Sequence, residues 1–461
     1  MAKKDTTGKR QNKKARPTAD SIEVSKVGDG SAIAAGRGAK ATSVVINFFG
    51  GKWQLLISLL AIILAVGGYF LWRELNPAKM TGDFRVAVAN FAVIGNSDKA
   101  SAGTELAEGV YLKLNESLSE VSKDFTITIW SPDKVGKIEG DTPEERALSA
   151  EKITKRIDAD VLVYGLIDIS EPVWKITPEF YIASENFYEA EEITGQHQMG
   201  EPISLVGQEN VARRIELSNK FESRAQAISR ITIGLAYYSL QDFQNALKVF
   251  QSAENIPGWD ESQGKEVLYL LAGNAAMMTK DFDTSMTDLN KALSIEPDYG
   301  RPLITMGSVY YLQALGPFEK TKKQSDIDLS LIDMAVEKFK QALKAKNQPA
   351  LSDIPTKAHF GLGQCYLMQS YTGMGLSLNK AVDEFQIVIT NYGNGKNPRI
   401  RELAAESHAR LGLINNLSGY SNDAAQEYQL AAELLFDNPE RQKQYQERAQ
   451  ELFAGTTTTT P

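Results

Sequence analysis

The chain is poor in the residue types that most often carry catalysis, metal binding and covalent cross-links. Its 461 residues include one cysteine, Cys365, and three histidines, His197, His359 and His408. A single cysteine excludes a disulfide within the chain, so folded domains must be stabilised by burial of apolar side chains. Cys365 lies in an apolar helical pattern without an accompanying His or Asn motif, which predicts a packed thiol rather than a reactive one.

Short catalytic and nucleotide-binding motifs are also absent from the sequence. There is no HExxH, CxxC or GxSxG, and the glycines of the loop at residues 92–103 fit neither a P-loop nor a dinucleotide-binding spacing. His359 and His408 occupy equivalent places in two successive repeats, where we expect packing rather than metal binding. The sequence therefore predicts a protein that is not an enzyme and has no catalytic site, no metal site and no cofactor.

One long apolar run does occur, at Trp53–Trp72. It holds 20 residues without an ionisable side chain, and Lys52 and Arg73 flank it. A helix of this length spans about 30 Å, the thickness of the hydrocarbon core of a bilayer, and its terminal Trp and Tyr rings suit the headgroup level. The run is too long and too far from the N-terminus for a cleaved signal peptide. We therefore predict a single transmembrane helix at residues 53–73, which places the chain in a lipid bilayer.

Charge differs on the two sides of this run. Residues 1–52 carry a net charge of +7, whereas the remainder of the chain carries −15. Basic residues favour the cytoplasmic side, so we predict a cytoplasmic N-terminus, a location in the cytoplasmic membrane and extracytoplasmic residues 73–461. Residues 1–52 lack a periodic apolar pattern, which predicts a disordered basic tail. The tail could contact nucleic acid or anionic lipid, but we favour a solvated topology signal and expect no nucleic-acid partner.

Residues 80–206 alternate between strand and helix patterns. The buried run Ala159–Ile169 is typical of a central strand, and the TPEE sequence at Thr142 opens a capped helix. This order predicts a small α/β sandwich-type domain. The expected strands are Phe84–Phe91, Phe125–Trp130, Ala159–Ile169, Phe180–Ile182 and Phe187–Ile193, and the expected helices are Gly103–Val121 and Thr142–Ile157.

Three stretches of this region resemble the N-terminal α/β domain of TolB-like and CsgG-like envelope proteins. They are Val86–Phe91 (VAVANF), Gly103–Leu106 and Ala159–Gly165 (ADVLVYG). The resemblance implies a non-catalytic domain that serves assembly in the cell envelope.

From residue 209 to 453 the sequence is helical and self-similar. Each copy has an apolar residue and a glycine, followed by a small residue, an aromatic or Leu, and another small residue. The offsets agree in the first, second and fifth copies. The third copy has extra residues at about Ala314–Ser330, which we expect to form an insertion between its helices, and the fourth has six extra residues. The glycines of the copies are Gly234, Gly273, Gly307, Gly363 and Gly412. Small residues let two helices approach closely, and the large residue fills the space between them. This pattern resembles tetratricopeptide (TPR) repeats, with the 34-residue period kept between Gly273 and Gly307. Residues 454–461 are expected to form a disordered tail.

The TPR resemblance implies a groove lined by the first helix of each repeat, which binds proteins or peptides. Repeat position nominates nine groove residues: Tyr238, Asn274, Met277, Arg301, Ser308, Tyr311, Lys357, Gln364 and Leu367.

The sequence thus predicts an α+β multidomain protein: a single transmembrane helix, a small α/β domain and an all-α TPR solenoid. The function it favours is a membrane-anchored scaffold for protein–protein interactions in the cell envelope. The alternative is an envelope sensor whose α/β domain binds a small molecule and signals through the anchor. The partner is expected to be a protein or peptide in the TPR groove, and homo-oligomerisation is left open.

Overall fold

The computed structural model describes most of the second compact unit of the chain, Ala78–Pro461. The described residues are 78–95, 101–119, 125–171, 173–187, 190–206, 219–347, 353–371, 375–395 and 400–457. The predicted basic tail and the apolar run Trp53–Trp72 lie outside these residues.

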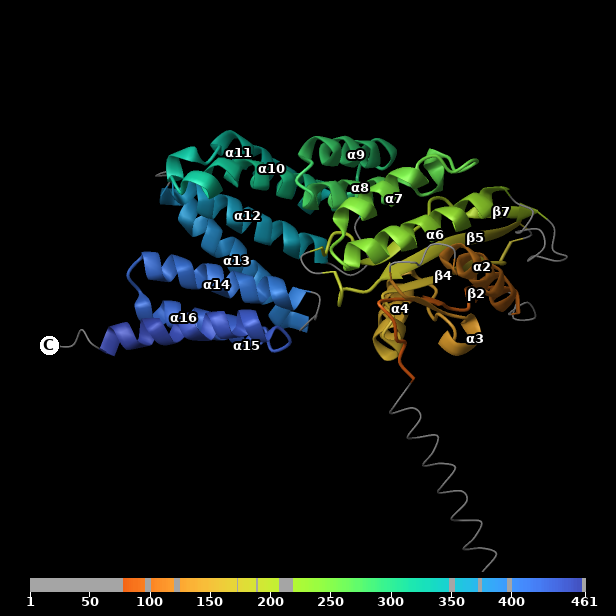
Figure 1. Ribbon diagram of the computed structural model, residues 1–461, viewed down its shortest axis with the longest axis horizontal. Coiled ribbons are helices and arrows are strands. Elements are labelled where there is room, and N and C mark those ends of the chain that lie inside the picture. Colours follow the sequence, from red (N-terminus) through yellow and green to blue (C-terminus); the bar gives the residue numbers. More distant parts are fainter. Residues whose placement is uncertain are drawn as a thin grey trace, which may run out of the picture. The chain divides into compact units, whose positions relative to one another are not determined.

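A mixed sheet of seven strands forms the first part of the unit (Figure 1). Its order is β3-β1-β4-β5-β6, with β2 paired to β4 and β7 paired to β5. Strands β3, β1, β4 and β2 run parallel, whereas β5 is antiparallel to β4, β6 and β7. The strands are β1 (Phe84–Val88), β2 (Ala92–Ile94), β3 (Ile127–Trp130), β4 (Val161–Asp168), β5 (Val173–Ile182), β6 (Gly195–Gln198) and β7 (Ile203–Val206).

Helices cover both faces of this sheet because its central strands are apolar on both sides. One face packs against α2 (Ser101–Ser119), and the other packs against α3 (Pro132–Val135) and α4 (Pro143–Ile157). The start of α4 is set by a capping box, in which the Thr142 side chain accepts from the Glu145 amide and the Glu145 carboxylate accepts from the Thr142 amide.

Helix pairs make up the rest of the unit, and each pair packs on the next (Figure 1). The first helices of the pairs are α6 (Asn219–Ser239), α8 (Lys265–Met278), α10 (Gly300–Thr321), α12 (Asp353–Tyr371) and α14 (Arg401–Leu417). Their partners are α7 (Phe243–Ala253), α9 (Phe282–Ile295), α11 (Leu329–Lys344), α13 (Gly375–Gly395) and α15 (Ser421–Leu434), and α16 (Pro439–Thr457) follows. Short 3₁₀ turns, η2 (Glu261–Gln263) and η3 (Gln324–Asp326), lie between pairs or within a pair.

The contact that defines the repeat pattern is present in all five pairs. A Cβ built on the glycine of each first helix would collide with, or press tightly against, the large residue of its partner helix. Gly234 faces Phe250, Gly273 faces Leu289 and Gly307 faces Phe339. Gly363 faces Phe385, and Gly412 faces Tyr428. The helices therefore cross where the sequence pattern places the small residues, as in TPR repeats.

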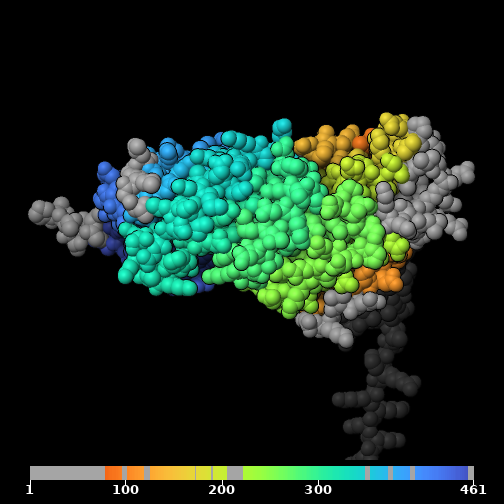
Figure 2. Space-filling model, turned by 90° about the horizontal axis from the view of Figure 1, so that it is seen from above, coloured from red at the N-terminus to blue at the C-terminus, as the bar shows by residue number. Residues whose placement is uncertain are grey.

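The sheet and the repeats share one hydrophobic core. Helix α6 packs against α2, and the core residues of the sheet continue into those of the first repeats. The rings of Phe125 and Tyr237 meet edge to face, with centroids 5.0 Å apart. In Figure 2 the yellow residues of the sheet region adjoin the green residues of the first repeats on the visible face. The two parts that the sequence divides near residue 206 thus fold against each other.

The fold class and the localisation predicted from the sequence require correction. Among the described residues, no helix is long and apolar enough to cross a membrane. Helix α10, which has 22 residues, carries exposed charged residues such as Lys320 near its end. A single-pass membrane protein with an extracytoplasmic main body is therefore not supported. The described chain is mostly helical, with a small sheet region and helical repeats.

Three further expectations differ from the structure. The extra residues expected as an insertion at Ala314–Ser330 mostly lengthen α10, which runs to Thr321, before η3. Helix α16 extends to Thr457, beyond the expected boundary at residue 453. The stretch Phe187–Ile193 is not a strand in its described residues, because turns replace it at Glu191–Ile193.

We predict that Gly273→Leu destabilises the repeats. The ideal Cβ of residue 273 would lie 2.7 Å from Leu289 Cγ, so a larger side chain must push α8 and α9 apart. The expected loss is about 1–3 kcal/mol in the free energy of unfolding, measured by urea denaturation.

Gly109→Ala provides the control, since nothing lies within 4 Å of the Cβ position of this glycine in α2. That change should stabilise the chain by about 0.5–1 kcal/mol. Equal midpoints for the Gly273→Leu variant and the unmodified chain would contradict the repeat register.

Candidate functional site

The inner helices α8, α10, α12 and α14 contact one another in succession and carry most of the predicted groove residues. Position in the repeat decides which side chains face inwards. Arg301, Lys357 and Glu406 each stand six residues before the glycine of their repeat. All three make ion pairs or hydrogen bonds with other parts of this same chain.

Arg301 binds a segment of the sheet domain, Ala190–Gln198, which we call the resident segment. The Arg301 side chain is 1 % exposed. Its Nη1 donates to the carbonyl oxygens of Glu192 and Thr194 over 2.9 and 2.6 Å, and its Nη2 donates to that of Gln196 over 2.8 Å. A planar guanidinium with several donors suits such converging carbonyls better than a lysine would. The Arg301 side chain thus binds backbone carbonyl oxygens that, in a sheet, would accept hydrogen bonds from a neighbouring strand.

The carboxylates of the resident segment bind two further groove residues. Lys357 Nζ lies 2.5 Å from Glu191 Oε2 and 2.8 Å from Glu192 Oε2. Burial acts to lower the pKa of Lys357, but the two carboxylates outweigh it and raise this pKa above its ordinary value. Asn274 Nδ2 donates to Glu192 Oε1, and Tyr238 Oη donates to Asn274 Oδ1. Side chains of the repeats thus bind both carboxylates of this acidic pair from the sheet domain.

His197, at the end of the resident segment, is buried beside Arg301. Its Nε2 lies 3.1 Å from Arg301 Nη1 and 2.8 Å from the carbonyl oxygen of Ile193. Its ring stacks on Phe180, with centroids 5.0 Å apart. Burial, and then the neighbouring Arg301 charge, lower the pKa of His197 well below its ordinary value, so the ring is neutral at pH 7. Its role in the structure is packing.

The nine predicted groove residues fall into three groups. Tyr238, Asn274 and Arg301 are buried around the resident segment. Leu367 is buried in the core. The other five line one cavity: Met277, Ser308, Tyr311, Lys357 and Gln364.

This cavity, of about 270 Å³, is the groove pocket. The resident segment forms one wall through Glu191 and Glu192, and α14 forms another. Most of the lining is apolar, and Met278 and Leu312 are 40 % and 38 % exposed. The remaining lining residues are Phe339, Phe360, Gly361, Glu402, Leu403, Glu406 and Arg410.

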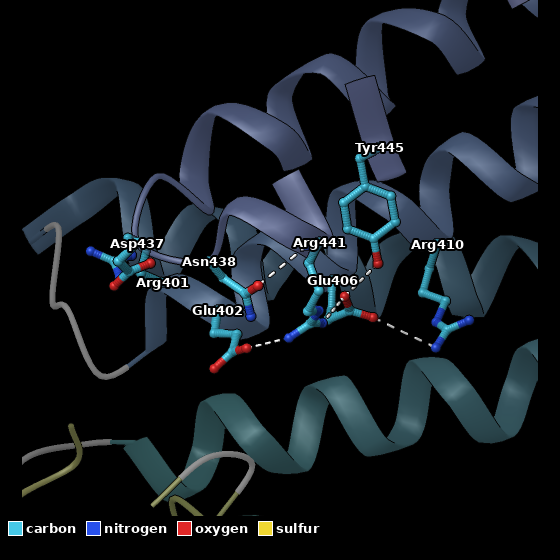
Figure 3. Close-up of polar contacts among 8 residues, drawn as sticks. All are labelled: Arg401, Glu402, Glu406, Arg410, Asp437, Asn438, Arg441 and Tyr445. Atoms are coloured by element: carbon cyan, nitrogen blue, oxygen red, sulfur yellow. Dashed lines mark hydrogen bonds and ion pairs between the residues drawn. The ribbon is translucent and has the colours of Figure 1, made fainter. Parts of the chain in front are cut away.

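Charged residues on the α14 side of the groove pocket are engaged by the last helix (Figure 3). Arg441 of α16 reaches between Glu402 and Glu406 and binds both carboxylates. Glu406 also accepts a hydrogen bond of 2.6 Å from Tyr445 Oη. Arg410 Nη2 lies farther away, 3.7 Å from Glu406 Oε2. Arg441 therefore binds both carboxylates on the acidic side of the pocket, as Lys357 binds both carboxylates of the resident segment.

A second cavity, of about 570 Å³, lies where the β6–β7 turn meets α8, α9 and α10. Its lining includes Glu201, Glu261, Glu266 and Glu296. Burial, followed by the like charge of Glu296, raises the pKa of Glu266 to about 7. Among the described residues, no group of His, Cys, Asp and Glu is arranged to hold a metal ion.

The two histidines outside the groove bind carboxylates of their own repeats, and the cysteine is buried. His359 Nδ1 lies 2.6 Å from Glu384, and His408 Nδ1 lies 2.7 Å from Glu427, so the equivalent residues link the two helices of their repeats in the same way. Cys365 is buried, and burial raises the pKa of its thiol.

Sequence reasoning did not select Glu191 and Glu192, which lie in the stretch expected to form the strand Phe187–Ile193. Both carboxylates are buried against the repeats. Neither Arg441 nor Arg410 was selected either. The sequence does contain one signal for such partners. Arg301 and Lys357 occupy the same inward-facing repeat position, and a cation that faces inwards needs carbonyl or carboxylate acceptors from elsewhere in the chain.

Comparison with known proteins finds solved structures that are similar to this chain at low scores. No protein-family model matches the chain, and no curated protein sequence matches it. Similar solved structures include TTC0263, a thermophilic TPR protein of Thermus thermophilus (TM-score 0.35, 14 % identity, 48 % of this chain and 98 % of that one). Another is PilW, a type IV pilus biogenesis factor (TM-score 0.32, 18 % identity, 50 % and 93 %). A monomeric IFIT1 mutant with m7Gppp-AAAA is a third (TM-score 0.34, 17 % identity, 51 % and 57 %).

The fold itself is defined by the chain's own geometry, in which helix pairs cross at a glycine as in TPR repeats and join a small sheet domain.

We predict that Arg301→Met destabilises the whole described unit. The change leaves three buried carbonyl oxygens without their charged donor, which should cost about 3 kcal/mol or more in the free energy of unfolding. Hydrogen exchange should show loss of protection in the resident segment. Arg230→Met, at an exposed position of α6, is the control and should change stability by about 0.5 kcal/mol or less. Similar effects of the two changes would contradict the importance of the Arg301 contacts.

A pH dependence of stability follows from Glu266. In the folded chain the Glu266 carboxyl has a pKa of about 7, whereas in the unfolded chain its pKa is near 4.5. Between these values the folded state binds more protons, so the free energy of unfolding falls as pH rises, by up to about 3 kcal/mol. Glu266→Gln should flatten this slope in urea titrations near pH 5 and near pH 8. Parallel profiles for the two proteins would rule out a raised pKa for Glu266.

Proposed function

We propose that this chain is a TPR-type scaffold that acts by binding a protein partner in the groove pocket. The sheet domain occupies the first part of the groove through the resident segment. The pocket between α8, α10, α12 and α14 is the part that remains accessible to another protein.

The exposure of Met278 and Leu312 carries this proposal. Both side chains lie on inner helices, line the groove pocket and are more than one third exposed. Apolar side chains grouped in a concave surface with a polar rim are typical of protein-binding sites. Met is also common at surfaces that adapt to a bound segment.

Binding, not catalysis, fits the charged groups of the pocket. Lys357, Glu402 and Glu406 are held in ion pairs within the chain. Groups fixed in this way orient and rigidify the walls of a pocket. The sensor alternative depended on a membrane anchor and loses its support with the correction above.

Photo-crosslinking tests the proposal. A benzoylphenylalanine placed at position 312 of the full chain should form a specific covalent adduct with the partner, because this side chain lies in the groove pocket. Position 148, in α4 of the sheet domain, is the control: Leu148 is similarly exposed but lies outside the pocket.

Met278→Asp should weaken partner capture by about tenfold or more while leaving helicity intact, because a carboxylate replaces an exposed apolar contact. Leu148→Asp should leave capture unchanged. Adducts at position 148 and none at 312 would place the partner elsewhere on the protein.

A further inference from the structure

The charges that line the groove pocket are unequally satisfied. Lys357 is paired with Glu191 and Glu192, and both Glu402 and Glu406 are bound by Arg441. Arg410 is the exception. Its contact with Glu406 is 3.7 Å long, and that carboxylate already accepts from Arg441 and Tyr445.

Arg410 is also the most exposed of these charged side chains, at 38 %. Its Nε is buried and has no hydrogen-bond acceptor among the residues that the structure describes. The buried Nε is out of reach of a ligand, but the terminal nitrogens of this partly exposed guanidinium can donate to a planar anion such as a carboxylate. The lining holds four carboxylates, so this capacity to bind an anion is local to Arg410.

The resident segment shows which chemistry this groove accepts. It is an internal stretch of chain, and it presents glutamate side chains to Lys357 together with apolar residues that are buried beside the repeats, such as Ile193. Glu191 and Glu192 form part of the wall of the groove pocket, so a second segment bound in the pocket would lie next to the resident segment.

We propose that the groove pocket binds an internal acidic segment of a partner protein, with one carboxylate side chain on Arg410 and a neighbouring apolar side chain against Met278 and Leu312. This inference rests on the proposed function and specifies the partner's chemistry. Arg410 stands two residues before Gly412, not at the position of Arg301 and Lys357. The site is therefore separate from the cations that the resident segment occupies.

The experiment uses the full chain and two acetylated, amidated peptides, which carry no free terminal charge. The first has the sequence of residues 185–198, which combines the acidic and apolar residues that this groove already holds. The second has glutamine in place of every glutamate. Fluorescence anisotropy should show that the acidic peptide binds about tenfold tighter, with a preference that weakens as salt is raised.

Arg410→Gln should abolish this preference, because the amide cannot replace the guanidinium. Arg448→Gln, at a half-exposed arginine of α16 outside the pocket, is the matched control and should keep it. Leu312→Glu is a second variant, since a carboxylate in the pocket should repel the acidic peptide even if Arg410→Gln folds poorly.

Several outcomes would overturn the inference. Equal affinities for the two peptides, or absence of binding, would remove the acidic preference. A preference that persists in Arg410→Gln would show that the peptide displaces the resident segment instead. A peptide with lysine in place of each glutamate should bind more weakly than either, and tighter binding would reverse the assigned charge. If crosslinking at position 312 nevertheless captures a partner, the scaffold function stands and only the acidic chemistry fails.

Discussion

The structure depends on one buried guanidinium that holds together two parts of the chain. Arg301 comes from a repeat helix, and its carbonyl acceptors come from the sheet domain more than 100 residues earlier. Removing a charge from water is costly unless converging acceptors replace the water, and carbonyls lose their own hydration in the same contact. Replacing either partner alone would therefore leave buried polar groups unsatisfied. This constraint, with the shared hydrophobic core beside α6, makes the sheet and the repeats a single folding unit.

The same repeat position has three different uses along the groove. Arg301 binds backbone carbonyls, Lys357 binds two carboxylates, and Glu406 reverses the sign and binds Arg441. Each charge is compensated from within the chain, although the compensating groups come from opposite ends of the described unit. The resident segment of the sheet domain occupies one end of the groove, and α16 binds the helix at the other end. The groove pocket lies between these two contacts. Its walls are thus ordered before any partner arrives, which reduces the entropy lost on binding.

How much the sequence could predict follows from the range of the interactions. The contact of Gly234 with Phe250 recurs at the same offset in two other helix pairs and with extra residues in the remaining two, so one local pattern predicts all five pairs. Inward-facing positions such as Met277 and Tyr311 follow from that register. The path of the resident segment cannot be predicted from that register. Phe187–Ile193 has the composition of a strand, and the carbonyl oxygens of the resident segment are bound by Arg301, which is distant in the sequence. The membrane prediction rested on residues outside the described structure, and no described helix is long and apolar enough to cross a membrane.

Arg441 has a role for the last helices similar to that of Arg301 for the earlier repeats. A terminal helix pair has a neighbour on one side only, so it needs interactions that an internal pair obtains from packing on both sides. The two carboxylates of α14 supply them, and Tyr445 adds a hydrogen bond to Glu406 (Figure 3). This arrangement engages the acidic groups of the groove pocket without engaging Arg410 to the same degree. The ion pairs that hold the last helix therefore also determine that Arg410 is the charge left for a partner. Stability at the end of the repeats and selectivity in the pocket thus arise from one set of ion pairs.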